Sequence, residues 1–359
     1  MSSSPTAGEF MKVLAPMPVG VRPPNLFFSQ ALPPEQDFSV LIANVSNGFE
    51  APGVSFSGPD DLIVNGHAFN VISARSGLLK ETVLLADHLP LKDFFAGVTQ
   101  TRTMEDAGKS MLVASNIFAH NYFHWTTQCM AAILLYRIAI KPSGGAIATA
   151  GLTPIMLEML QLHGVEMDVM EIAPQQMAII TGGHCCNLLG DGFTHFPHPQ
   201  IVRLLREPLG RIAPGRTFGR KLYITRKDSA KRRLMNEDAV EQRLLARGFE
   251  ILQLSDLRLA DQMAAFRDAE VIVAPHGAGL TNLIYCDVAR APARVIELAQ
   301  GNYVNMCFIR IGQLLGLDYS FIVNPADPLT AVLANGNPDE TTWHADLPLL
   351  DRVLDEQGV

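Results

Sequence analysis

The sequence predicts an α/β protein of two lobes, the second of which contains a doubly wound parallel sheet. Strand-like and helix-like segments alternate with short joints between Lys221 and Leu298, a pattern typical of parallel strands covered by helices. Residues 207–219 contain two prolines and three glycines and predict a linker between the lobes. With 359 residues, of which 48% are hydrophobic and 18% charged, the chain is long enough to build two cores.

Changes in composition along the chain predict five parts. They are an irregular tail (1–38), a β-rich N-terminal extension (39–105), a first α/β lobe (106–215), a second α/β lobe (216–330) and a C-terminal loop and helix (331–359). In the extension, short apolar runs between turn-forming residues predict strands at 39–43, 62–64, 69–72 and 82–85.

Each lobe has its own expected order of elements. In the first lobe we expect a strand at 111–114, a long apolar helix at 122–140, a helix at 154–162 and a strand at 167–172. In the second lobe we expect strands at 221–225, 250–254, 270–274 and 294–298, with helices after Asn236, near Ala260 and near Leu280. Asn236 is a favourable N-cap residue, and the two acidic residues after it suit the positive end of a helix dipole.

The overall charge and the apolar segments exclude several classes of protein. A net charge of −8 and a pI near 5.7 argue against a nucleic acid as the main partner. No apolar run has the length of a transmembrane helix, and the N-terminus lacks the basic and apolar regions of a secretory signal. Five scattered cysteines without a Cys-x-x-Cys pattern argue against a disulfide framework and a structural zinc site. We therefore expect a cytoplasmic protein without a transmembrane segment, and leave peripheral association with a membrane open.

A glycine-rich turn follows the buried strand of residues 271–274. It reads Pro275-His276-Gly277-Ala278-Gly279-Leu280-Thr281-Asn282. Ligands of parallel sheets bind beyond the carboxyl ends of the strands, where glycines let the backbone approach closely and a helix N-terminus presents free N–H groups. We expect a diphosphate at this turn, with His276, Thr281 and Asn282 as hydrogen-bond donors. A tight turn that needs glycine only for steric reasons is the alternative.

An otherwise acidic chain places five cations in one loop after the strand at 221–225. They are Arg226, Lys227, Lys231, Arg232 and Arg233. Planar guanidinium groups suit bidentate contacts with phosphate oxygens, so we expect Arg226, Lys231 and Arg233 to bind the same diphosphate. A charge run facing solvent is the alternative.

Glu297 lies inside an apolar strand, residues 294–298. A buried carboxylate without partners is costly, so this side chain must have partners or reach a site. We expect it to bind the two hydroxyls of a ribose; an edge position that faces water is the alternative.

The first lobe carries a second cluster where its long helix begins, His120-Asn121-Tyr122-Phe123-His124-Trp125. A histidine near its ordinary pKa can take a proton as a general base, and we expect His124 to have that role. A capped helix start with aromatic packing is the alternative. His120 and His124 have a spacing that can share a metal on a helix, but Asn121 replaces the glutamate of a metalloprotease helix, and we expect no metal site.

Taken in order, these segments resemble glycosyltransferase family 61, including its bacterial members linked with capsular polysaccharide synthesis. The resemblance extends over residues 110–300 and is strongest from 221 to 298. It rests on the segments 121–125, 223–228, 232–238, 248–250 and 269–282, in this order and at these spacings.

The resemblance implies a fold of two Rossmann-like lobes facing a cleft, of the GT-B type. It also implies an inverting, metal-independent hexosyl- or pentosyltransferase that moves a sugar from a nucleoside diphosphate sugar to a glycan or lipid-linked glycan, in surface polysaccharide synthesis. Asn121, Tyr122, Trp125 and Gln128 then lie on the acceptor side. The chain has no Asp-x-Asp, so cations and backbone N–H groups would have to neutralise the leaving group, and we expect no cofactor.

Gln128 departs from the family pattern, because members commonly carry an acidic residue at this place. Gln cannot act as a base, so either His124 or a carboxylate from elsewhere does so, or the protein is a non-catalytic binder of a nucleotide-sugar or glycan. A nicotinamide-dependent oxidoreductase is less favoured, because it requires Gly-x-Gly-x-x-Gly after its first strand and Asn282 stands where the third glycine would be.

Overall fold

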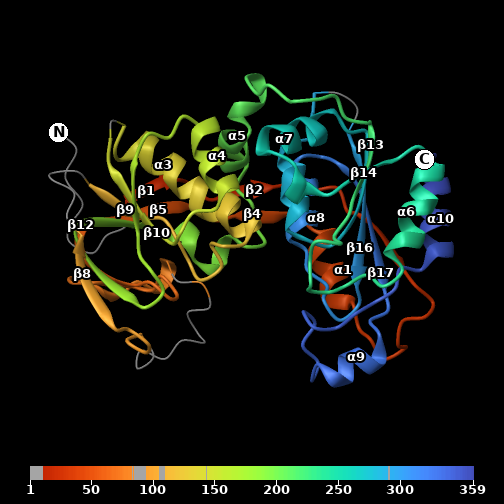
Figure 1. Ribbon diagram of the computed structural model, residues 1–359, viewed down its shortest axis with the longest axis horizontal. Helices are drawn as coiled ribbons and strands as arrows, with labels where there is room; N and C mark the ends of the chain where they lie inside the picture. The colour runs from red at the N-terminus through yellow and green to blue at the C-terminus, as the bar shows by residue number, and fades with distance from the viewer. Residues whose placement is uncertain (1–10, 83, 85–93, 105–109, 143, 290–291) are drawn as a thin grey trace. The chain divides into compact units, whose positions relative to one another are not determined.

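The computed structural model describes residues 11–82, 84, 94–104, 110–142, 144–289 and 292–359. The chain forms two compact units, which are described separately (Figure 1). Unit 1 consists of residues 1–18 and 50–207, and unit 2 of residues 19–49 and 208–359. The third passage between the units, at residues 207 and 208, falls at the start of the predicted linker.

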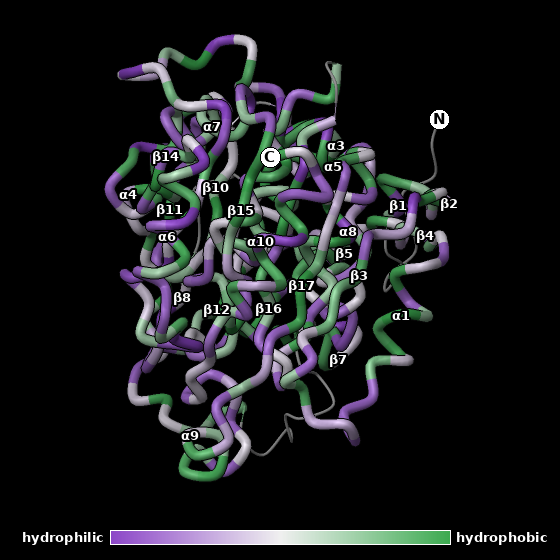
Figure 2. Tube along the Cα trace, turned by 90° about the vertical axis from the view of Figure 1, so that its right-hand side faces the viewer, coloured by the Kyte–Doolittle hydropathy of each residue, from purple (hydrophilic) through white to green (hydrophobic). Residues whose placement is uncertain are grey.

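Within its described residues, unit 2 contains a six-stranded sheet in which all neighbouring strands run parallel. Its order is β14 (Glu250–Leu252), β13 (Lys221–Ile224), β15 (Val271–Pro275), β16 (Arg294–Gln300), β17 (Asp318–Asn324) and β3 (Asn25–Phe28). The four strands predicted between residues 221 and 298 are all present, so the prediction of a parallel α/β sheet is confirmed for this part of the chain. Figure 2 shows that hydrophobic residues concentrate along β15, β16 and β17.

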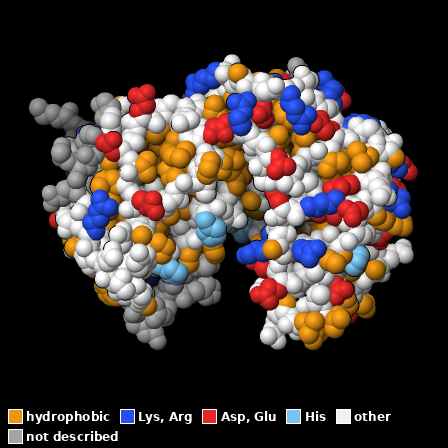
Figure 3. Space-filling view, in the orientation of Figure 1, with side chains coloured by type: hydrophobic (Ala, Val, Ile, Leu, Met, Phe, Trp, Pro, Cys, Tyr) orange, Lys and Arg blue, Asp and Glu red, His pale blue; other side chains and the backbone are white. Residues whose placement is uncertain are grey.

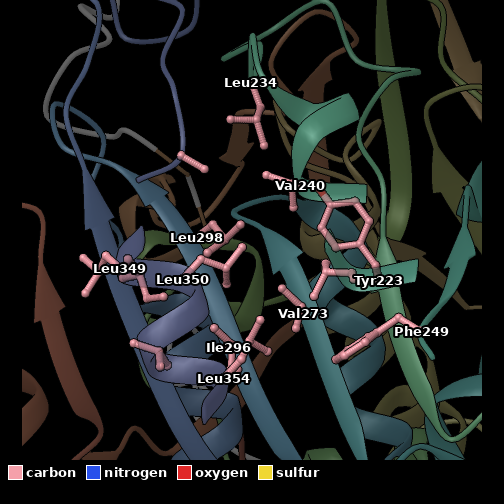
Figure 4. Close-up of a cluster of buried hydrophobic side chains, with 14 of the residues drawn as sticks. Tyr223, Leu234, Val240, Phe249, Val273, Ile296, Leu298, Leu349, Leu350 and Leu354 are labelled. Atoms are coloured by element: carbon pink, nitrogen blue, oxygen red, sulfur yellow. The ribbon is translucent and has the colours of Figure 1, made fainter. Parts of the chain in front are cut away.

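Helices cover both faces of this sheet. The helices on one side are α6 (Glu237–Ala246) and α10 (Leu347–Glu356), and those on the other side are α7 (Leu259–Asp268) and α8 (Cys307–Leu314) (Figure 1). Strand side chains such as Tyr223, Val273 and Ile296 form one buried cluster with Leu350 and Leu354 of α10 (Figure 4). Since each fully buried Leu or Ile contributes about 2 kcal/mol, this cluster is sufficient to hold α6 and α10 against the sheet.

The strand order of unit 2 reverses once, between β13 and β15. From β13 the chain moves to β14 on one side, then passes through α7 and returns to β15 on the other side of β13. Both strands end at this reversal, and a 3₁₀ helix, η9 (Ala278–Tyr285), follows β15. Such a reversal leaves a crevice at the carboxyl ends of the strands, which is where ligands bind in sheets of this kind.

The N-terminal segment is more regular than the sequence indicated. Within residues 11–38, predicted as an irregular tail, β1 (Met11–Leu14) pairs with a strand of unit 1 and β3 extends the sheet of unit 2. β2 (Met17–Val19) and β4 (Phe49–Ala51) form a separate two-stranded sheet. The prediction was wrong because prolines and glycines surround the short apolar run of β3, which becomes a strand only by pairing with β17.

Residues 39–43 form part of a helix, α1 (Ser39–Ser46), and the predicted strand there is wrong. The carboxylate of Asp37 accepts hydrogen bonds from the backbone N–H of Ser39, at 2.8 Å, and from its hydroxyl. These bonds favour a helical first turn over an extended chain. Short apolar runs do not distinguish the two structures by themselves.

The described residues of unit 1 form a nine-stranded mixed sheet. Its central strand β12 (Gln176–Cys186) is antiparallel to β5 (Val54–Asn65) and parallel to β9 (Met111–Val113). The other strands are β10 (Ala146–Thr149), β11 (Asp168–Glu171), β6 (Val71–Ser73), β7 (Gly77–Leu78), β8 (Gln100–Met104) and β1. The predicted strands at 62–64 and 69–72 lie in β5 and β6, whereas that at 82–85 lies partly outside the described residues. Because β5 pairs with β12, the β-rich extension shares one sheet with the first α/β lobe instead of forming a unit of its own.

The long helix predicted at 122–140 is present and has an irregular middle. It consists of α2 (Tyr122–His124), a π-helical turn η4 (Trp125–Met130) and α3 (Ala131–Ala139). The side chain of Asn121 caps it by accepting the backbone N–H of Phe123 at 2.9 Å. The helix α4 has the predicted bounds, Pro154–Leu162, and α5 (Pro199–Leu205) follows later in the unit.

The helix α9 (Pro328–Leu333) presents an apolar surface on unit 2. Its Leu329, Val332 and Leu333 are 68%, 74% and 73% exposed, and Figure 3 shows hydrophobic side chains gathered at this position. Among the described residues, no helix combines the length and apolar character needed to cross a bilayer.

Candidate functional site

A pocket of about 300 Å³ lies in unit 2 where β13 and β15 end, at the reversal of strand order. Its volume is at the lower end of the range for ligand pockets, about 300–1,000 Å³. It is lined by Ile224, Thr225, Arg226, Asp228, Ser229, Leu254, Ala274, Pro275, Gly277, Ala278, Gly279 and Leu280. The fold therefore brings the glycine-rich turn and the first cation of the basic loop to one pocket, as their places after neighbouring strands predicted.

Arg226 is fixed rigidly at the wall of this pocket. Its Nη1 donates to the backbone oxygen of His276, and its Nη2 donates to the hydroxyl of Ser229 at 3.0 Å. Burial, and then the nearby charge of Arg232, lower the pKa of Arg226 to about 10, which leaves the guanidinium charged at pH 7. A charged, partly desolvated guanidinium held in one geometry is well suited to bind phosphate oxygens.

Gly277 is a glycine because Arg226 lies against its backbone. A Cβ built on Gly277 would stand 2.7 Å from Nε of Arg226, too close for any pair of these atoms. The backbone itself needs no glycine, because its φ of −179° and ψ of 163° are extended. The first N–H groups of the following helix η9 have no partner within the helix and point toward its N-terminal end, beside this guanidinium.

Glu237 positions the start of the basic loop, and the sequence analysis missed this role. Its Oε1 accepts hydrogen bonds from the hydroxyl of Tyr223 at 3.0 Å, the hydroxyl of Thr225 at 2.8 Å and the backbone N–H of Arg226 at 2.9 Å. Glu237 had been assigned only to the first turn of α6, where acidic residues are common. Its burial, with 5% exposure, shows that it instead ties α6 to the end of β13.

His276 and Glu297 form a buried pair behind the turn. Nδ1 of His276 donates to Oε1 of Glu297, and the hydroxyl of Tyr319 donates to Oε2 at 2.6 Å. Glu297 has no exposed surface, so the structure differs from the prediction that it binds a ribose. The carboxylate instead orients the imidazole, which packs against the rings of Tyr303 and Phe308.

Thr281 and Asn282 are both fully buried in η9. Nδ2 of Asn282 donates to Oε1 of Gln262 at 2.9 Å, which ties η9 to α7. Neither residue lines the pocket, so the structure does not bring them to the expected phosphate position. They lie in the helix interior because η9 begins at Ala278 and its first turn already ends before Thr281.

The cations of the basic loop have different surroundings. Nζ of Lys227 lies 2.6 Å from carboxylate oxygens of both Asp238 and Glu241, and these bonds raise its pKa. Lys231 and Arg232 both pair with Asp339. Three of the five cations are therefore neutralised by nearby carboxylates.

Arg233 is exposed, like Lys227 and Lys231 of this loop, but it differs from them in its partners. Among the described residues its guanidinium has no ion pair, and it lines a second pocket of about 260 Å³. This pocket adjoins the first, since Arg226 and Ser229 line both. Arg226 and Arg233 together thus give the two pockets a positive wall.

A segment near the C-terminus fixes the basic loop in place. The backbone N–H of Arg232 donates to the carbonyl of Asp339 at 2.9 Å, and Nε1 of Trp343 donates to the carbonyl of Arg232 at 2.9 Å. The backbone N–H of Trp343 also donates to the carbonyl of Arg233 at 3.0 Å. The sequence did not indicate this role, because the segment lies about a hundred positions after the loop. A single Trp in a polar stretch was the signal that could have pointed to it.

In unit 1, the imidazole of His124 is hydrogen-bonded to the side-chain amide of Gln128. Its Nδ1 lies 2.7 Å from Oε1 of Gln128, and Nε2 of Gln128 donates to the carbonyl of Gly190 at 2.9 Å. Burial lowers the pKa of His124, an effect that the hydrogen bond to Gln128 opposes. The imidazole is therefore mainly neutral at pH 7, as a general base must be.

The other predicted acceptor-side residues differ in exposure. Asn121 is exposed and Tyr122 is half-buried, so both can meet a ligand. Trp125 is 1% exposed and Gln128 fully buried, so neither can touch one directly. The indole of Trp125 packs in the core and does not provide a surface on which a sugar ring could stack.

His198 has a structural role at the start of α5. His198 caps α5, with its Nδ1 accepting the backbone N–H of Gln200 at 3.2 Å. Within the described ranges, no group of three or more His, Cys, Asp or Glu side chains is placed to hold a metal ion.

Residues 122–296 match the model of the family described as Glycosyltransferase 61. The match supports membership of glycosyltransferase family 61. It includes His124 and Gln128 of unit 1 as well as the basic loop and the glycine-rich turn of unit 2, whereas Asn121 and Glu297 lie just outside it. A search of curated proteins gives no match to this sequence. The mixed α/β units with parallel strands are consistent with a glycosyltransferase fold, and a glycosyltransferase implies a sugar donor and an acceptor.

Proposed function

We propose that this chain is an inverting glycosyltransferase of the GT-B type that needs no metal. It moves a hexosyl or pentosyl group from a nucleoside diphosphate sugar to a hydroxyl of a glycan or lipid-linked glycan, in surface polysaccharide synthesis. The observation that carries the proposal is the guanidinium of Arg226, held against the backbone of Gly277 at the pocket where the strand order reverses. The match to the glycosyltransferase 61 family supports it.

The donor's diphosphate is assigned to the two adjoining pockets of unit 2. Arg226 and the exposed Arg233 supply positive charge, and the N–H groups at the start of η9 supply further donors. As the bond to the sugar breaks, negative charge grows on the diphosphate, and fixed donors stabilise that charge without reorganisation. Lys231 contributes less, because its ammonium already pairs with Asp339 at 2.8 Å.

His124 is assigned as the base on the acceptor side. Nε2 takes the proton of the acceptor hydroxyl while its oxygen forms a bond to the anomeric carbon of the donor. The bond from that carbon to the diphosphate oxygen breaks, and its electron pair leaves with the nucleoside diphosphate. Attack opposite the leaving group inverts the anomeric configuration.

Calorimetric titration with UDP and GDP tests the donor site. The wild-type chain should bind at least one of them, and the double variant Arg226→Ala/His276→Ala should bind at least about tenfold more weakly, since the charge-assisted bond of Arg226 to phosphate contributes roughly 1.5–3 kcal/mol. Normal binding by the double variant would remove the donor-site assignment.

Assay of sugar transfer separates the enzyme from a non-catalytic binder. A glycosyltransferase releases nucleoside diphosphate and glycosylated product with one of a panel of glycan acceptors. Donor binding without product across the panel would favour the binding protein, and full turnover in a His124→Ala variant would remove His124 as the base.

A further inference from the structure

Gln128 stands where an acidic residue was expected, and its contacts define the chemical state of His124. The side chain is fully buried, within the π-helical turn Trp125–Met130. Its Oε1 lies 2.7 Å from Nδ1 of His124. π-Helical turns are rare and occur mostly at functional sites.

The orientation of the Gln128 amide is fixed by backbone groups. Nε2 donates to the carbonyl of Gly190 at 2.9 Å, so the amide oxygen must face His124. Nδ2 of Asn116 donates to the same oxygen at 3.0 Å and to the carbonyl of Leu189 at 3.1 Å. The Asn116 amide is fixed in turn, because its Oδ1 accepts the backbone N–H of Phe118 at 3.1 Å.

An amide oxygen only accepts hydrogen bonds, so Nδ1 of His124 must carry a hydrogen. In the neutral imidazole, Nε2 is then the nitrogen with a free electron pair. A neutral imidazole in water prefers the opposite arrangement, with its hydrogen on Nε2, so the protein has to select the tautomer.

We propose that Gln128 is a positioning residue that holds neutral His124 with its hydrogen on Nδ1, which leaves Nε2 free to accept the proton of the sugar acceptor. The role of Nε2 in sugar transfer rests on the proposed function. The tautomer of His124 is inferred from the hydrogen bonds of Gln128 alone. Gln128 itself touches no substrate, because it has no exposed surface.

An amide selects the tautomer without adding charge. A carboxylate at position 128 would accept the same hydrogen and would also stabilise the imidazolium, which raises the pKa of a histidine. The charged and titratable groups around His124 are His120 and His195, which lower its pKa, and Asp191, which raises it. With Gln128 the base stays neutral at pH 7, whereas an acidic residue would keep a larger share of it protonated.

Nitrogen NMR of the full chain with ¹⁵N-labelled histidine tests the tautomer without substrate. The His124 signals are assigned by their loss in His124→Gln and are recorded above the pKa of the ring. Wild type should carry the hydrogen on Nδ1, and Gln128→Met should move it to Nε2 in most molecules. A wild-type hydrogen on Nε2, or an unchanged tautomer in Gln128→Met, would overturn the proposal.

Gln128→Glu separates positioning from a merely structural role. This variant keeps the acceptor for Nδ1–H but loses the bond to the carbonyl of Gly190 and buries a charge, so it should be less stable than Gln128→Met. We nevertheless expect it to retain the Nδ1–H tautomer, with a raised pKa of His124. If both Gln128→Met and Gln128→Glu lost the tautomer with hydrogen on Nδ1, the role of Gln128 would be structural only.

Steady-state kinetics then connects the tautomer to transfer. Gln128→Met should lower kcat by roughly 100-fold with little change in KM, the size expected when a general base is disabled. If NMR gives the expected tautomer while His124→Gln keeps full turnover, the proposed role of His124 as the base fails and the tautomer assignment stands. If Gln128→Met changes the tautomer but leaves kcat unchanged, positioning for catalysis is refuted.

Discussion

The guanidinium of Arg226 occupies the space that a side chain on Gly277 would need: a Cβ there would lie 2.7 Å from Nε. Nη1 of Arg226 also donates to the carbonyl of His276, so the cation follows the backbone of the turn. Glu237 holds the backbone of Arg226 from the other side at 2.9 Å. The glycine-rich turn and the basic loop are therefore parts of a single structure, so a change in one should alter ligand binding by the other.

Gly277→Ala should weaken binding of UDP or GDP by roughly tenfold or more, because the methyl group displaces Arg226 and breaks one charge-assisted contact with phosphate. The extended backbone at Gly277 accepts alanine without strain, so the chain should still fold. Calorimetric titration measures the effect. Gly210→Ala is the matched control, because a Cβ at Gly210 meets nothing within 4 Å, and equal affinities for the two variants would contradict this account.

Arg233→Ala should weaken nucleoside diphosphate binding by about tenfold, whereas Lys227→Ala should change it by less than about twofold. Both side chains line the second pocket, but Lys227 already has Asp238 and Glu241 as partners. Titration of the two variants at one salt concentration makes the comparison. A larger loss of affinity for Lys227→Ala than for Arg233→Ala would mean that binding depends on the total positive charge of the loop and not on whether a cation already has a carboxylate partner.

The acidic limb of the transfer rate should lie below pH 6.5. The base must be neutral, and burial lowers the pKa of His124 from its ordinary value of 6.5. As the pH falls through this lowered pKa, the imidazole gains a proton and kcat falls; above it, kcat is level until another group titrates. A profile of kcat against pH checks this, and an acidic limb centred above pH 7 would be inconsistent with His124 as the base.

Glu297→Ala should lower the free energy of unfolding by about 2–4 kcal/mol, since it leaves the buried donors of His276 and Tyr319 without an acceptor. Urea denaturation measures this. Glu270→Ala provides the control, because that carboxylate is half-exposed and pairs with Arg220 at the surface, where a loss of about 0.5 kcal/mol is expected. If Glu297 instead contacted a ribose, its removal would weaken nucleotide binding and leave stability nearly unchanged.

Much of unit 2 could be predicted because its signals are local. The strand of residues 271–275 is continuously apolar, as a strand buried on both faces must be, and the turn after it contains Gly277, the glycine that the close approach of Arg226 requires. The position of both loops at strand ends was enough to predict that they meet. The helix after Asn236 also begins where expected, although the Asn236 side chain bonds to the backbone of Ala345 and not to the helix.

The parts that sequence reasoning missed depend on distant partners. Asp339 and Trp343 hold the basic loop from more than a hundred positions away, and β3 becomes a strand by pairing with β17. The sequence also did not show which polar side chains are buried. Glu297 and Gln128 have suitable chemistry for direct contact with a ligand, but both side chains are fully buried. The hydrophobic periodicity of a strand or helix does not show which other parts of the chain will cover a given side chain.

A crystal structure of the chain with bound UDP or GDP tests the central claim most directly. The account predicts diphosphate oxygens within hydrogen-bond distance of the Arg226 guanidinium and of the N–H groups at the start of η9, in the pocket between the ends of β13 and β15. A nucleotide bound elsewhere, with this pocket empty, would contradict it.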